Sequence, residues 1–214
     1  MLQISEKQND LEWTSAAHLG LGNVARERYL DLEAKEHYYK GIALSLENGN
    51  DEDADAAKAN LAVILRRLGQ FEECFELLEE LVAKARQRDD LVNLIITLIT
   101  YAISLGLSGR PQKVPEILFE CWGLCNTLNY PSGKYRCLTV AHTLSIKTEN
   151  WRDAALFAGS IHALEHKSDY VTESSLQTYQ SYMQLTKVNL LEEEYEEAFQ
   201  TGSRLALPSF KLLA

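Results

Sequence analysis

Apolar residues along this chain recur at the three- and four-residue spacing of amphipathic helices, and short polar breaks interrupt them at regular intervals. One such run before the break at Gly69 and Gln70 carries Leu61, Ile64, Leu65 and Leu68. The run after the break carries Phe71, Cys74, Leu77, Leu78, Leu81 and Val82. Two amphipathic helices joined by a short break form an antiparallel hairpin, and the pattern therefore predicts a helical hairpin over residues 52–86.

This hairpin repeats with a period of about 40 residues, which is within the range of helical-repeat families. When the chain is aligned with itself at that offset, matching positions hold small or apolar residues, such as Ala34, Cys74, Val114 and Ala154. A second matching series is Gly22, Ala62, Ala102 and His142. Small residues let two helices approach to about 8–10 Å, so we expect Ala62 to face Cys74. The repeat predicts a single helical domain over residues 1–214, with hairpins at residues 11–47, 52–86, 90–128, 132–167 and 171–206.

The turns of this repeat resemble those of tetratricopeptide repeats. Leu21-Gly22 matches the family's Leu-Gly pair, and Gly69 to Cys74 matches its Gly-x-aromatic-x-x-small turn. The period is longer than the usual value of about 34 residues and approaches that of HEAT or armadillo units. The Gly-x-aromatic-x-x-small turn favours a tetratricopeptide repeat over those units. The resemblance implies an all-α, right-handed α-solenoid of about five tetratricopeptide-like helical hairpins.

The chain also resembles, more narrowly, the C-terminal helical repeat region of LuxR-type, MalT-like and SARP-type bacterial transcriptional regulators. The likeness rests on Ala154 to Ser160 and, more loosely, on Tyr195 to Arg204. It implies a module of a bacterial regulatory protein. The sequence lacks a Gly-x-x-x-x-Gly-Lys-Ser/Thr phosphate loop, and no separate basic helix-turn-helix region remains outside the five hairpins.

The first ten residues align with the end of the second hairpin at an offset of two repeats, so that residues 6–11 match residues 86–91. This match predicts that residues 1–10 are the tail of a preceding helix, and the alternative is an irregular N-terminal arm. A helix tail at this edge would leave a surface through which the chain self-associates.

The charge of the chain argues against a nucleic-acid or anionic membrane surface. The 31 acidic and 21 basic side chains give a net charge of −10. The run from Leu91 to Gly109 contains no charge and is close to the length of a membrane span. Because this run contains polar residues and fits the repeat, we expect a buried helix with no membrane contact. The N-terminus lacks a secretory signal and the four cysteines are expected to be reduced, which together predict a cytoplasmic protein.

The sequence offers little catalytic chemistry. It has no Gly-x-Ser-x-Gly or His-Glu-x-x-His motif, and we predict that the protein is not an enzyme and has no cofactor. His162 and His166 are four residues apart, as are Cys121 and Cys125 one repeat earlier, which is a conceivable zinc ligand set. Cys121 occupies a recurrent apolar position of the repeat, so we expect core packing there and no metal.

The concave surface of the solenoid is the better candidate for function, since the first helix of each hairpin lines the inner groove of such superhelices. The repeat register and the neighbouring basic residues predict a groove lined by Asn23, Arg26, Asn60, Val63, Arg66, Arg67, Ile96, Ile99, Thr100, Ile103, Arg136, Thr139 and Thr143. An apolar floor flanked by arginines suits a partner's peptide segment or domain with acidic ends. The alternatives are a small-ligand sensor domain of a transcriptional regulator and a self-associating structural spacer.

Overall fold

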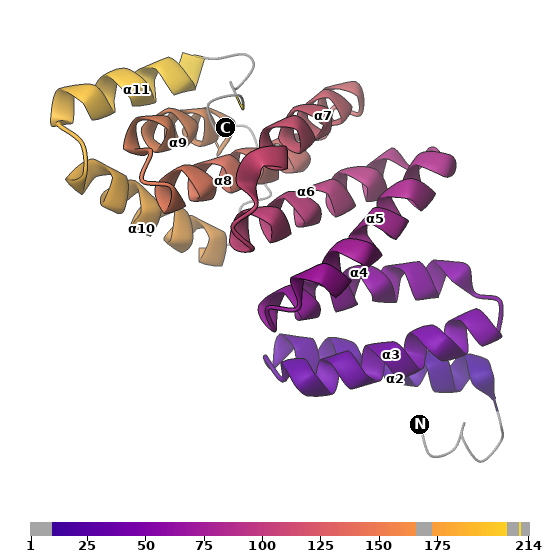
Figure 1. Ribbon diagram of the computed structural model, residues 1–214. Coiled ribbons are helices and arrows are strands. Elements are labelled where there is room, and N and C mark those ends of the chain that lie inside the picture. The colour runs from indigo at the N-terminus through magenta and orange to yellow at the C-terminus, as the bar shows by residue number, and fades with distance from the viewer. Residues whose placement is uncertain (1–9, 166–172, 205–209, 211–214) are drawn as a thin grey trace. The chain divides into compact units, whose positions relative to one another are not determined.

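The computed structural model describes residues 10–165, 173–204 and 210. Within those residues every regular element is a helix, and successive helices pack against their neighbours (Figure 1). The prediction of an all-α chain built from helical hairpins is confirmed. The expected helix tail at residues 1–10 and the end of the fifth hairpin fall almost wholly outside the described residues.

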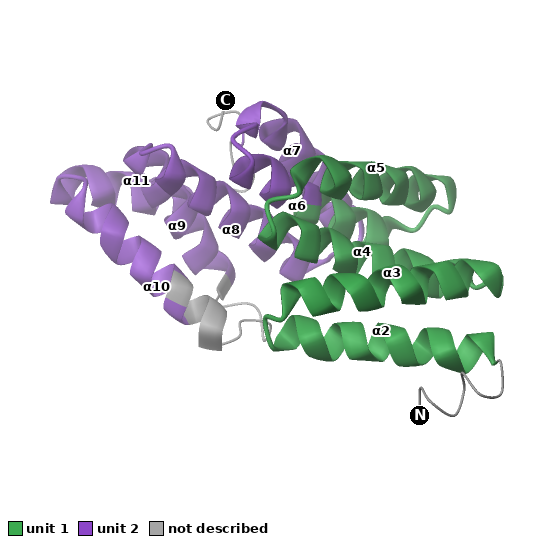
Figure 2. Ribbon diagram, turned by 60° about the horizontal axis from the view of Figure 1, so that its bottom comes forward, with its two compact units in different colours: residues 1–100 green, residues 101–214 purple. Residues whose placement is uncertain are grey.

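The chain divides into two compact units, and the first spans residues 1–100 (Figure 2). Its helices are α2 (Leu11–Glu27), α3 (Asp31–Glu47), α4 (Asp51–Arg67), α5 (Phe71–Gln87) and the start of α6 (Leu91–Leu107). α3 packs against both α2 and α4, and α4 packs against α5. The two hairpins expected at residues 11–47 and 52–86 therefore correspond to α2–α3 and α4–α5.

The second unit spans residues 101–214. After the end of α6 it holds the 3-10 helix η1 (Pro111–Lys113), α7 (Val114–Thr127), α8 (Pro131–Lys147), α9 (Trp151–Glu165), α10 (Glu173–Val188) and α11 (Glu192–Arg204). α8 packs against α7 and α9. Because the boundary between the units falls inside α6, a single continuous domain stays a prediction.

Short left-handed junctions follow each of the helices from α2 to α8. Within the described part of the chain, residues with positive φ stand at equal intervals, at Tyr29, Gly49, Gly69, Asp89, Gly109, Asn129 and Glu149. After each, the next backbone N–H donates to the carbonyl five residues earlier, as Gln70 N does to Leu65 O at 2.8 Å. This is the Schellman termination, which satisfies the last carbonyls of one helix while the chain reverses.

The junctions impose a structural period of one helix and one junction, which is half the period seen in the sequence. α2 to α6 and α8 each run for 17 residues, and a three-residue junction separates each from the next helix. Buried residues consequently recur at the same place near the start of successive helices, at Ala34, Ala54, Cys74, Leu94, Val114 and Ala154. The Cys74 thiol donates to Ala62 O at 3.2 Å, so the expected contact between these two residues is confirmed.

Two glycines bring α9 and α11 into backbone contact. A Cβ on Gly202 would collide with the carbonyl of Leu156, and one on Gly159 would collide with the carbonyl of Phe199. The Ser160 hydroxyl donates to Gly202 O at 3.0 Å across the same contact. α11 therefore lies along α9 as well as following α10 (Figure 1).

Among the described residues, no helix combines the length and the apolar character that crossing a membrane requires. α6, which contains most of the uncharged run, is 17 residues long.

The left-handed junctions predict opposite effects for two substitutions. A non-glycine residue in the left-handed conformation costs about 1–2 kcal/mol. Glycine avoids this cost, but part of the gain is lost because glycine has more conformational entropy in the unfolded chain. We expect Glu149→Gly to raise the free energy of unfolding by about 0.5–1 kcal/mol and Gly69→Ala to lower it by about 1 kcal/mol. Denaturant unfolding followed by circular dichroism measures both. Glu149→Ala is the control and should change stability by less than about 0.5 kcal/mol. Equal stability of Glu149→Gly and Glu149→Ala would contradict the prediction.

Candidate functional site

Three of the predicted groove residues in the first unit hydrogen-bond to one another. Arg26 Nη1 donates to Asn60 Oδ1 at 2.5 Å, and Asn60 Nδ2 donates to Asn23 Oδ1 at 3.2 Å. The Tyr38 hydroxyl on α3 donates to the same Asn23 oxygen at 2.7 Å, and burial raises the pKa of this tyrosine. These contacts join α2, α3 and α4, so the three groove residues stabilise the packing of the first two hairpins.

The other two predicted groove arginines of this unit are partly shielded from solvent. Arg67 donates to Arg26 O at 3.2 Å, forms an ion pair with Asp31, and lies with its guanidinium carbon 5.2 Å from the centre of the Tyr29 ring. Arg66 is half-buried, and burial lowers the pKa of its guanidinium. Its Nε has no hydrogen-bond partner among the described residues. Val63, on the same helix, is half-buried.

The predicted apolar floor on α6 is only partly accessible. Ile96 and Thr100 are half-buried, and the Thr100 hydroxyl donates to Ile96 O at 2.9 Å. Ile99 is 0% exposed, so its predicted place on an open groove surface is wrong. The reason is that α6 buries a wide part of its circumference, with Ile95 and Leu98 also enclosed.

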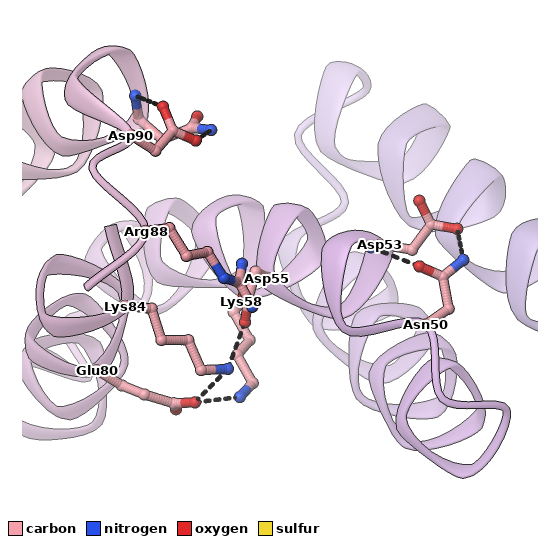
Figure 3. A network of polar contacts seen from close by, with 9 residues as sticks. Asn50, Asp53, Asp55, Lys58, Glu80, Lys84, Arg88 and Asp90 are labelled. Carbon is pink, nitrogen blue, oxygen red and sulfur yellow. Dashed lines mark hydrogen bonds and ion pairs between the residues drawn. The ribbon is translucent and has the colours of Figure 1, made fainter. Parts of the chain in front are cut away.

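One hollow lies in the first unit and is lined by both polar and apolar surface. It has a volume of about 340 Å³ and is lined by α4, α5, the start of α6 and the junction before it. Its cations are paired: Lys84 Nζ lies 2.7 Å from Asp55 Oδ1, and Arg88 Nη1 lies 2.9 Å from Asp55 Oδ2 (Figure 3). Figure 3 shows Lys84 reaching both Asp55 and Glu80, the second at 3.0 Å.

This ion-pair network ties α4 to α5. Lys58 on α4 lies 2.7 Å from Glu80 on α5, and that hydrogen bond is the main cause that lowers the pKa of Glu80. The hydrogen bond to Asp55 raises the pKa of Lys84. Because carboxylates already neutralise both cations that line the hollow, its chemistry is that of a helix-packing contact.

Another hollow, which we call the α6–α8 hollow, lies in the second unit and is almost entirely apolar. It has a volume of about 170 Å³ and is lined by Ala102, Ile103, Gly106, Leu107, Thr139, Val140, Thr143, Leu144 and Lys147. The structure thus brings together Ile103, Thr139 and Thr143, three of the residues that the repeat register placed in a groove. Arg136, also predicted, is half-buried on α8 and does not line the hollow.

The other six lining residues were missed by the sequence interpretation. They continue the same helix faces: Gly106 and Leu107 follow Ile103 by three and four residues, and Lys147 follows Thr143 by four. A glycine inside an apolar helix was the available signal, because glycine commonly marks close approach or missing volume. Extending each register position by one helical turn would have found most of the hollow.

The α6–α8 hollow has the chemistry of an apolar anchor site with one charge at its rim. The Thr139 hydroxyl donates to Tyr135 O at 2.9 Å within its own helix, so its hydrogen-bonding need is met without a partner. Leu107 is 45% exposed and Lys147 is exposed. Lys147 is the one charged residue among the described lining residues. The surface is therefore suited to an apolar side chain that lies beside a negative charge.

The inner face of α8 carries a buried histidine. The His142 ring is T-shaped against Tyr179 at 5.9 Å and Tyr182 at 6.1 Å between ring centres. Its Nε2 has no hydrogen-bond partner among the described residues, and burial lowers its pKa to about 4. Desolvation disfavours the imidazolium, so His142 is neutral at neutral pH.

The candidate zinc ligands do not converge in the described part of the chain, where no three His, Cys, Asp or Glu side chains are arranged to hold a metal ion. Cys121 and Cys125 are fully buried, and a hydrogen bond with Cys137 is the main cause that raises the pKa of Cys125. His162 instead lies against Phe199 at 5.5 Å between ring centres, and His166 falls outside the described residues. Protonated, buried thiols pack as small apolar side chains.

The buried His142 predicts a loss of stability in acid. Its pKa is about 4 in the folded protein and about 6.5 in the unfolded chain, so protons favour unfolding as the pH falls between these values. We expect the free energy of unfolding to decrease by roughly 3 kcal/mol from this residue alone between pH 7 and pH 4. Denaturant unfolding of the wild type and His142→Ala across that range measures the difference. Ala occupies the equivalent positions 62 and 102, and parallel pH curves would contradict the prediction.

Comparison with known proteins adds no family to this description. No protein-family model matches the chain, and no curated protein is significantly similar to it. The resemblance to bacterial transcriptional regulators therefore stays a hypothesis. The chain is a helical-repeat protein, and the α6–α8 hollow is an apolar surface site on its second unit.

Proposed function

We propose that this protein is a non-catalytic scaffold that binds a peptide segment of a partner protein in the α6–α8 hollow. The observation that carries the proposal is the composition of the hollow, in which apolar side chains surround about 170 Å³ of space and Lys147 supplies the charge. An apolar side chain of the partner fills the hollow. The hydrophobic effect contributes the affinity, and the lysine orients an acidic neighbour.

The size of the hollow favours a peptide anchor over a small ligand. Small-molecule sites usually enclose about 300–1,000 Å³ and bury most of the ligand. The α6–α8 hollow is smaller, and the half-exposed Leu107 at its margin leaves it in contact with solvent. A single side chain of an extended peptide or of an amphipathic helix matches such a volume, as in groove recognition by other helical surfaces. The sensor alternative therefore has less support.

The placement of the hollow between two first helices supports a repeat-based binding surface. Ile103 on α6 and Thr143 on α8 are one sequence repeat apart and occupy the same position of that repeat. The inner face of helical repeats is the usual site of partner recognition. The sequence resemblance to bacterial regulators points to a partner in a cytoplasmic regulatory system, and we propose that setting for the function.

Filling the hollow tests this proposal. A Cβ on Gly106 would meet Leu144 Cδ1 at 3.5 Å, an ordinary contact, so the side chain introduced by Gly106→Leu occupies the hollow without displacing backbone. Panning a phage-displayed random peptide library against the full-length protein should enrich peptides that pair an aliphatic or aromatic residue with Asp or Glu. We expect Gly106→Leu to weaken the binding of those peptides about tenfold or more, which calorimetry measures as a higher dissociation constant.

Gly123→Leu is the matched control. Gly123 is also a helical glycine of the second unit, and a Cβ there meets nothing within 4 Å. Both substitutions should preserve thermal stability, because each replaces a helical glycine with a better helix former. A loss of binding in Gly106→Leu alone supports the proposal. Equal affinity of the two variants, or enrichment of peptides without an apolar residue, refutes it.

A further inference from the structure

The outward face of α2 is an apolar stripe that the described part of the chain leaves exposed. Its members recur at spacings of three and four along the helix and are Trp13, Ala16, Ala17, Gly20, Leu21 and Val24. Trp13 is 55%, Val24 49% and Leu21 40% exposed. The face that packs on α3 is instead built from smaller and polar residues, including Ser15 and His18. α2 therefore exposes three of its large apolar side chains.

Packing among the described residues does not require the glycine at the middle of this stripe. A Cβ on Gly20 would meet nothing within 4 Å, so neither close packing nor a special backbone conformation requires it. Glycine in a helix interior costs about 1 kcal/mol relative to alanine. Together with Ala16 and Ala17, it makes the centre of the stripe flat enough for a second helix to approach closely.

We propose that this stripe, called the α2 face, binds the α2 face of a second copy of the chain in an antiparallel, two-fold pair. An isologous contact needs a surface that complements itself. With the helices reversed about a centre between Ala17 and Gly20, Trp13 lies beside Val24 of the second copy, and Leu21 lies beside the small Ala16. Large residues at each end of the stripe thus oppose smaller ones, and the small centre permits the crossing.

The charges at the two ends of α2 complement each other in the same pairing. Asp10 and Arg28 lie on one flank of the stripe, at nearly equal distances from its centre, so each carboxylate faces the guanidinium of the second copy. Asp10 caps α2 by accepting from Trp13 N at 3.1 Å through one oxygen, which leaves its other oxygen available. The exposed Arg28 has no ion pair among the described residues. A second copy therefore suits the face in both shape and charge.

This inference is independent of the proposed function, because the α2 face belongs to the first unit and the α6–α8 hollow to the second. Sedimentation equilibrium of the full-length protein tests it. We expect the average mass to rise from 24.2 kDa toward twice that value, with a dissociation constant of about 10–100 µM for so small an interface. A single species of 24.2 kDa up to about 500 µM overturns the proposal, and so points to another occupant of the face.

Variants separate the α2 face from other contacts. Gly20→Gln places a long polar side chain at the crossing and should abolish the dimer, whereas the control Gly123→Gln, also at an open helical glycine, should leave it intact. Asp10→Asn retains a capping side chain and should weaken the dimer about two- to tenfold, as should Arg28→Gln. The double variant should be no weaker than either single one. Dimerisation that survives Gly20→Gln, or additive effects of the two charge variants, refutes the pairing.

Discussion

The left-handed residues in the junctions that follow α2 to α8 are the constraint on which the packing of these helices depends. Each of these junctions is three residues long, and one of its residues adopts positive φ at equal spacing from Tyr29 to Glu149. The helices that these junctions join therefore begin at corresponding points of the register and bury corresponding stripes. A junction longer by one residue would rotate the next helix by about 100° and turn its apolar stripe away from the core. The α6–α8 hollow follows from the same spacing, since Ile103 and Thr143 hold one register position on two helices.

The hairpins could be predicted from the sequence, but the shorter period could not. Helical spacing of apolar residues and the breaks at Gly69 and Gly109 mark the hairpins directly. Only three of the seven left-handed positions in the described residues are glycine, and others hold Tyr29 and Glu149, residue types that carry no sequence signal for this conformation. The period of one helix and one junction is therefore not evident from the sequence.

The candidate site could be predicted in part, because a register gives the direction of a side chain but not what covers it. Ile103, Thr139 and Thr143 were assigned to one side and meet in one hollow. Ile99 was assigned there too, and it is buried because α6 is enclosed over most of its circumference. Arg26 and Arg67 were expected to meet a partner, and they instead hydrogen-bond within the first unit. Such a contact depends on residues of the neighbouring hairpin, and the apolar pattern of one helix does not show which residues those are.

Partner recognition in the α6–α8 hollow can be measured by methyl NMR spectroscopy. The full-length protein, labelled at its methyl groups, is titrated with a peptide selected from a random library. We expect the largest shift changes at the methyl groups of Ile103, Thr139 and Thr143 and of their neighbours in the hollow, while the methyl groups of Val63 in the first unit stay unchanged. Shift changes centred on Val63, or on methyl groups that do not line the hollow, would show that the partner binds elsewhere.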